Sequence, residues 1–142
     1  MKNDDLFIIM NNYCESAQTK DLALHLSLYS DDVHLYDCWD TWEIKGKEAL
    51  SESVEDWFDG LVEEEVNLKV QFIDPIFEST DSLAFIHSEV LFTAYDKDNY
   101  ELRHISNRFT FNLKKMNNEW KIIHQHSSLP INPSTAKMMI KE

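Results

Sequence analysis

The sequence predicts an α+β fold in which three N-terminal helices pack on one face of a curved, mostly antiparallel sheet. Two observations carry this prediction. Helical spacing of apolar residues dominates the first 60 residues, and strand-like alternation dominates from residue 66 onward. Helices that precede a run of antiparallel strands are typical of the segregated α+β architecture. A curved sheet covered by helices leaves a conical pocket between the two layers.

Three segments have the apolar spacing of helices. Residues 4–17 form the first, and a shorter one begins near Thr19 and Asp21, which suit an N-cap and a first helical turn. The third is the clearest, because Gly46 opens it and Gly60 lies just past its predicted end. The residues of this third helix that we expect to face inward are Ala49, Leu50, Val54, Trp57 and Phe58.

The strands follow a different pattern. Residues 33–38 alternate as a short strand, and residues 42–44 are predicted to form another. Four long antiparallel strands then begin near residue 66, near residue 83, at Tyr100 and after an Asn-Asn turn. This order places the longest strands at the end of the chain.

Length and composition bound the class of protein. The 142 residues suffice for one domain, and we assign residues 1–130 to it and residues 131–142 to a C-terminal tail. With 13 basic against 26 acidic residues the net charge is −13, which argues against nucleic acid or an anionic membrane surface as partners. No apolar run approaches the roughly 20 residues of a membrane span.

The N-terminus and the cysteines indicate the compartment. The opening MKNDDLF lacks the pattern of a secretory signal peptide. Cys14 and Cys38 lie in apolar surroundings in the sequence, so we expect buried, reduced thiols. Together these features predict a cytoplasmic protein.

The C-terminal hairpin carries the strongest site signal. Alternation on its return strand groups Trp120, Ile122, His124 and His126 on one face. If Asn117-Asn118 is a two-residue loop, this face lies opposite Leu113, Phe111 and Phe109, and the histidines share a wall with aromatic rings. One extra residue would swap the faces and place Arg108, Thr110 and Asn112 beside the histidines.

Asp37 is the second candidate. It continues the apolar stripe of Val33 and Leu35, so a carboxylate would stand at a cavity wall, where desolvation favours its protonated form and suits proton transfer. The alternative is that Asp37 lies past the strand and bonds turn amides. The pattern alone leaves both interpretations open.

A metal site is a third hypothesis for the histidines. The His-x-His spacing of His124 and His126, with Asp37, would permit metal binding, yet no further cluster supplies the remaining ligands. We therefore expect no metal and no cofactor.

Three motifs recur in one known superfamily. The first is YSDDVHLYD (29–37) followed by GKEAL (46–50), the second is RFT (108–110) leading to WKII (120–123), and the third is HQHSS (124–128). Together they resemble the nuclear transport factor 2-like superfamily, specifically its SnoaL-like branch, over nearly the whole chain. The third motif is also similar to the closing strand of the association domain of calcium/calmodulin-dependent protein kinase II.

The resemblance implies a cone-shaped half-barrel, a deep pocket and dimerisation through the outer sheet face. Members include ketosteroid isomerases, polyketide cyclases, dehydratases, noncatalytic binding proteins and assembly domains. In the isomerases the general base lies where Asp37 falls. A tyrosine near the end of the first helix, roughly where Tyr13 falls, donates to the developing oxyanion.

Two departures from the relatives narrow this expectation. The isomerases carry a second oxyanion donor, an acid, on the penultimate long strand, and here that region reads His104-Ile105-Ser106-Asn107. This argues against steroid isomerisation. The kinase association domain has a pocket arginine near the position of Phe111, and only a shifted register would let Arg108 replace it.

Two functional hypotheses follow. In the first, the chain binds an unidentified small molecule, possesses a mainly apolar pocket and acts by proton transfer as an isomerase, cyclase or dehydratase. Asp37 or His126 would move the proton, and Tyr13 and His124 would hold the polar end of the ligand. The remaining ligand-binding candidates are Trp57, Phe109, Phe111 and Arg108. In the second hypothesis, the chain is a noncatalytic oligomerisation or partner-binding module, and in either case we expect a homodimer.

Overall fold

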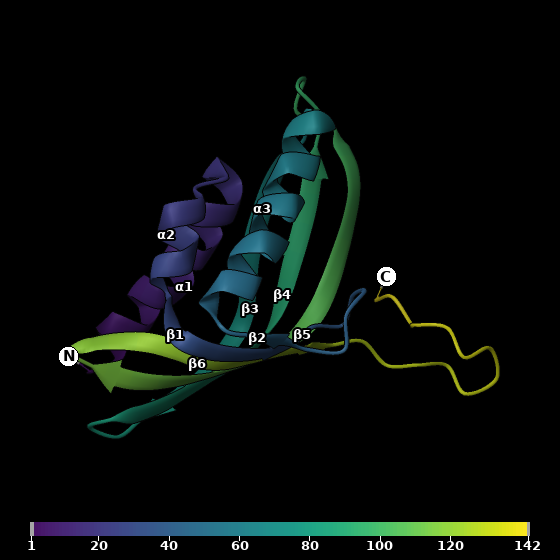
Figure 1. Cartoon of the computed structure of the whole chain (residues 1–142). Helices are drawn as coiled ribbons and strands as arrows, with labels where there is room; N and C mark the ends of the chain where they lie inside the picture. Colours follow the sequence, from purple (N-terminus) through teal and green to yellow (C-terminus); the bar gives the residue numbers. More distant parts are fainter. Residues whose placement is uncertain (1, 142) are drawn as a thin grey trace.

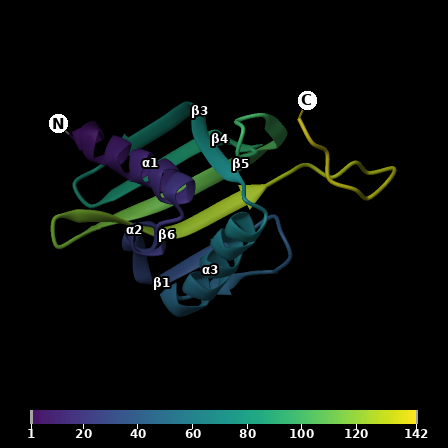
Figure 2. The ribbon, with the colours of Figure 1, turned by 90° about the horizontal axis from the view of Figure 1, so that it is seen from above.

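The computed structural model describes residues 2–141 of the chain. Three helices, α1 (Lys2–Thr19), α2 (Leu22–Ser27) and α3 (Lys47–Glu63), lie on the concave face of one curved, unclosed sheet (Figures 1 and 2). This confirms the predicted α+β architecture. None of the described helices is both long and apolar enough to span a membrane.

The sheet has six strands in the order β2-β1-β6-β5-β4-β3. Their bounds are β1 (Tyr29–Tyr36), β2 (Ile44–Lys45), β3 (Asn67–Ser79), β4 (Leu83–Tyr95), β5 (Glu101–Met116) and β6 (Glu119–Ser128). The pair β1 and β6 is parallel, and every other neighbouring pair is antiparallel. The last strand therefore lies in the middle of the sheet and joins the first strand to the β3–β5 meander.

Helix ends differ from the expected ones in two places. Asp21, and not Thr19, caps α2, because its Oδ1 accepts a hydrogen bond from the Leu24 amide at 3.0 Å. Helix α3 continues past Gly60 to Glu63, where the buried Leu61 holds the additional turn against the core. In the same helix Ala49 is exposed, in contrast to the prediction.

The start of α3 needs a glycine. Gly46 has a φ of 88°, a backbone conformation that residues with a Cβ rarely adopt. Its amide donates to the Val33 carbonyl at 2.7 Å, so the chain turns from β2 into α3 while still bonded to β1. This connection brings the loop that carries Asp37 back to the body of the protein.

The core lies between α1, α3 and the concave face of the sheet. Leu6, Met10 and Ala17 of α1 are buried against it. Phe58 of α3 contributes from the side of β1. The free cysteines Cys14 and Cys38 are only half-buried, so the expectation of full burial was wrong.

The segment that follows β6 leaves the sheet (Figure 1). A bridge between Ile131 and Met138 folds it into a small hairpin. It touches the convex face through Lys141, whose Nζ lies 2.6 Å from Glu89 Oε1. The hydrogen bond from Lys141, followed by that from Ser106, lowers the pKa of the Glu89 carboxyl.

Candidate functional site

The hairpin turn forms as predicted, but the register beyond it does not. Asn117 and Asn118 both have positive φ and make a two-residue loop that pairs Met116 with Glu119. Between Leu113, which faces Ile122, and Asn112, which faces His124, the return strand gains one residue. The extra residue, Ile123, is a β-bulge, and it exchanges the two faces of β6 from this point onward.

His124 and His126 consequently lie on the convex face. They pair with Asn112 and Thr110, while Gln125 and Ser127 pair with Phe111 and Phe109. The expectation that both histidines share a wall with Phe109 and Phe111 was wrong. The correct arrangement is the swapped one, and a bulge within the strand produces it rather than a longer turn.

On the convex face the histidines form a ring cluster with β1. The ring of His124 lies 5.3 Å from that of His34 and 5.1 Å from that of Tyr36, and the ring of His126 lies 5.3 Å from that of Tyr36. His124 Nδ1 donates a hydrogen bond to the His34 carbonyl oxygen at 2.7 Å. Partial burial, together with repulsion from His34 and His126, lowers the pKa of His124.

Arg108 also lies on the convex face. It is exposed, and its Nε donates to Ser128 Oγ at 3.2 Å. The arginine therefore points away from the helix-covered side of the sheet, on which Phe109 and Phe111 are buried. Within the described residues, no three histidine, cysteine, aspartate or glutamate side chains are arranged to hold a metal ion.

The concave face carries an aromatic wall. The ring of Tyr13 on α1 lies 6.3 Å from Phe109 and 5.8 Å from Phe111, edge to face in both cases. Phe92 of β4 lies 5.9 Å from Phe109 and 6.2 Å from Trp57 of α3. The structure thus brings four predicted ligand-binding residues, Tyr13, Trp57, Phe109 and Phe111, to one interior.

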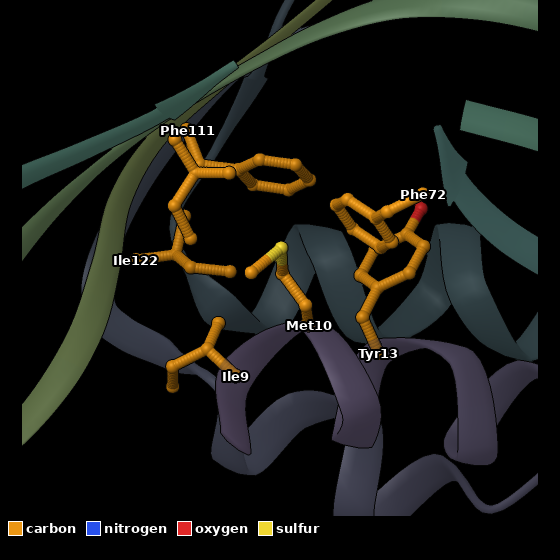
Figure 3. Close-up of a pocket in the computed structure, with 7 residues that line it drawn as sticks. Ile9, Met10, Tyr13, Phe72, Phe111 and Ile122 are labelled. Atoms are coloured by element: carbon orange, nitrogen blue, oxygen red, sulfur yellow. The ribbon is translucent and has the colours of Figure 1, made fainter. Parts of the chain in front are cut away.

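The space within this interior is narrow. Figure 3 shows the Met10 side chain between Ile122 and Tyr13, below the ring of Phe111. The gap among these side chains measures about 160 Å³, including the part open to solvent, and no point in it admits a water-sized sphere. Its full lining is Ile9, Met10, Tyr13, Phe72, Ile86, Phe111 and Ile122.

Asp37 directly follows the last residue of β1 and lies beside the C-terminal end of β6. Its Oδ1 accepts hydrogen bonds from Ser127 Oγ at 3.1 Å and from the Trp39 amide at 3.4 Å. The Ser127 hydroxyl in turn accepts from the Cys38 amide at 3.1 Å. The carboxylate therefore lies past the strand and bonds a turn amide, as one of the two interpretations predicted, and it also bonds the buried Ser127. Its place at a cavity wall stays a prediction.

The charge of Asp37 reaches into the interior. Burial, and after it the negative charge of Asp37, raises the pKa of the Tyr13 hydroxyl well above its usual value. Burial likewise raises the pKa of Tyr29, with smaller contributions from Tyr13 and Asp37. Both phenols stay protonated at neutral pH and can donate hydrogen bonds.

Two polar pairs of the interior were not found from the sequence. The Tyr29 hydroxyl donates to Gln125 Oε1 at 2.5 Å, and Ser16 Oγ lies 2.8 Å from His25 Nδ1. Gln125 lies in the HQHSS motif, but alternation without the bulge predicts that its side chain faces away from the interior. His25 sits within the apolar stripe of α2, where nothing distinguished it from a surface histidine.

His25 is a buried neutral base. Its ring lies within 6.0 Å of the rings of Tyr13, Tyr29, Trp57 and Phe58, and burial lowers its pKa to about 4. The Ser16 hydroxyl has one proton, which it gives to the Tyr13 carbonyl at 3.0 Å. It must then accept from His25 Nδ1, which leaves the lone pair on Nε2 free to accept a hydrogen bond.

A curved, unclosed sheet covered on its concave face by three helices defines a class of protein, the nuclear transport factor 2-like superfamily. Within it, residues 8–132 match the SnoaL-like domain family. The chain belongs to the SnoaL-like family.

Solved structures agree with this fold. A nuclear transport factor 2-like protein of unknown function from Pseudomonas putida has a TM-score of 0.86 at 18% identity, covering 99% of this chain and 95% of that one. A putative calcium/calmodulin-dependent protein kinase II association domain from Xanthomonas campestris has a TM-score of 0.71 at 19% identity, covering 87% and 84%. ActVI-ORFA from Streptomyces coelicolor has a TM-score of 0.75 at 12% identity, covering 88% and 94%. At these identities the likeness shows the fold alone.

A search of curated proteins found no match to this chain.

Proposed function

We propose that the chain binds a small, mainly apolar molecule between α1 and the sheet, and that Asp37 moves a proton on it. The observation that carries the proposal is the position of Asp37, whose carboxylate is bonded to the buried Ser127 and influences both interior phenols. Isomerisation, cyclisation and dehydration all use one such proton transfer. The SnoaL-like fold supports a ligand-binding or isomerase-like protein.

Each polar residue has a role in this reaction. Asp37 takes a proton from a carbon or oxygen of the ligand, and Ser127 holds the carboxylate oriented. Tyr13 donates to the oxygen on which negative charge develops, which it can do because its raised pKa keeps the phenol protonated. Phe109, Phe111 and Trp57 contact the hydrocarbon part of the ligand.

Ligand entry requires a side chain to move. Met10 occupies the centre of the apolar gap, and an unbranched thioether adopts new rotamers more readily than the surrounding rings. We therefore expect Met10 to turn aside when a ligand binds. The ligand class is small and uncharged, because its body must fit among apolar side chains.

The first experiment is a thermal-shift screen of steroids and polyketide-like aromatics, with carboxylic acids as the charged class that should not bind. A ligand at a hundred times its dissociation constant raises the free energy of unfolding by about 2.7 kcal/mol. With a substrate in hand, Asp37→Asn should lower the rate at least about a hundredfold, because a positioned base contributes two to four orders of magnitude.

Asp40→Asn is the matched control, since Asp40 is an exposed carboxylate in the same loop with a positive φ that asparagine tolerates. An unchanged rate for Asp37→Asn would remove Asp37 from the chemistry.

We also propose that the chain forms a homodimer through the convex face of the sheet. Tyr36 and Ile76 are 40% and 55% exposed on that face. Tyr36 contacts the histidine cluster, and Ile76 lies on the edge strand β3, at the other side of the face. Light scattering after size exclusion should give twice the chain mass. Ile76→Glu should give the mass of one chain, and a single-chain mass for the unmodified protein would contradict the proposal.

A further inference from the structure

The side chain of Asn107 is a buried amide whose carbonyl oxygen is not hydrogen-bonded. Its side chain is 4% exposed, and Oδ1 has no hydrogen-bond partner among the described residues. Ser30 Oγ and Trp120 Nε1 share this property. Ser30 lies at the start of β1, and Trp120 lies two residues after the hairpin turn, beneath Lys115. Of these three unbonded atoms, Asn107 Oδ1 is the one that carries no proton and can only accept a hydrogen bond.

Register places Asn107 on the same side of the sheet as Asp37. It lies on β5 opposite the buried Val90, two residues before Phe109. Phe109 pairs with Ser127, which donates to Asp37. Two strand spacings and two residues separate Asn107 from Asp37, roughly 12 Å on a flat sheet. Asn107 and Asp37 therefore lie on either side of Phe109 on the concave face of the sheet.

An unbonded buried carbonyl lowers the stability of the folded chain, because the amide loses its water without gaining a partner. An apolar side chain of the same size would serve the core better. Buried polar groups without partners occur in native proteins mainly where function needs them. The position of Asn107 is therefore better explained by a partner that comes from outside the chain.

We propose that Asn107 is a binding residue whose Oδ1 accepts a hydrogen bond from a hydroxyl or N–H group of the bound ligand. This inference rests on the proposed function and names the ligand class more closely. The ligand is an uncharged ring system that Asp37 deprotonates at one end and that carries a hydrogen-bond donor at the opposite end. An anionic ligand is excluded, because binding would bury its charge in an apolar interior beside the negatively charged Asp37 carboxylate.

The first test needs no ligand and compares two isosteric changes. Asn107→Leu removes an unbonded amide and should raise the melting temperature by roughly 3 °C. Gln125→Met is the matched control, because Gln125 is also buried on the inner face but accepts from Tyr29. It should lower the melting temperature. If Asn107→Leu fails to raise the melting temperature, Asn107 is a structural residue and the inference fails.

The second test uses two probes, 2-naphthol and 2-methylnaphthalene, which are uncharged at neutral pH and differ in the donor. The unmodified protein should bind 2-naphthol more tightly, as measured by fluorescence titration. Asn107→Ala, which is expected to fold even if the leucine variant does not, should weaken 2-naphthol binding about tenfold and leave 2-methylnaphthalene unchanged.

The outcomes separate the inference from the proposed function. If both probes bind the unmodified protein equally, or if Asn107→Ala keeps the preference for 2-naphthol, Asn107 does not bind the donor, while an interior ligand site remains supported. If neither probe binds, the interior takes no ligand of this class, and the proposed function is contradicted together with the inference.

Discussion

The two faces of β6 have opposite chemistry, although the same ten residues supply both. Its concave face carries Gln125 and Ser127, each bonded to a residue from β1 or the loop after it. Its convex face carries His124 and His126 in a ring cluster open to solvent. The comparison shows that one bulged residue, Ile123, decides which polar groups meet the interior.

The largest expected effect comes from deleting Gln125. The deletion removes the partner of Tyr29 and turns one histidine toward the core, His126 if the bulge stays and His124 if the strand loses it. We expect a loss of more than about 4 kcal/mol in the free energy of unfolding, measured by urea denaturation.

Deletion of Ser134, in the exposed tail, should leave the stability unchanged. A near-native melting curve for the Gln125 deletion would show that the residues on the concave face of β6 do not stabilise the interior.

The second prediction concerns the pH dependence of stability, which depends on His25 of α2 beneath the concave face of the sheet. The pKa of His25 in the folded chain is about 4, below the unfolded value of 6.5, so the unfolded chain takes up the proton first as the pH falls. The contribution of neutral His25 to the free energy of unfolding is full above pH 6.5 and is lost as the pH falls toward 4. The loss should be on the order of 3 kcal/mol.

Urea denaturation at pH 7 and pH 4.5 measures this loss, and His25→Gln should make the difference between the two pH values smaller. His126→Gln, an exposed histidine of the convex face, should leave the difference unaltered. Equal effects of the two substitutions would contradict the burial of His25.

The smallest effect belongs to the convex face. His126→Ala should change the free energy of unfolding by no more than about 0.5 kcal/mol, because the imidazole is exposed and its ring contacts are with Tyr36 and His124 on the same open face. The measurement is made at low protein concentration, where one chain is observed. A loss above 2 kcal/mol would show that the cluster stabilises the fold.

The sequence was sufficient for the architecture and for part of the site. The Asn117-Asn118 turn follows from residues that tolerate positive φ, and the position of Asp37 at the end of β1 follows from alternation. The bulge did not follow, because Ile122 and Ile123 are chemically alike and either could be the inward residue. His25 and Asn107 were missed for a related reason: their role depends on which rings surround them, and that is set by residues far away in the chain.

The central place of β6 governs how the chain folds. Before β6 is synthesised, the β1–β2 pair and the β3–β5 meander have no strand between them, so neither piece can complete a core with α1. Pairing Tyr29 with Ile122 closes a loop of more than ninety residues, and such distant contacts form slowly. We therefore expect the interior to assemble late in folding, after β6 has paired with β1 and β5.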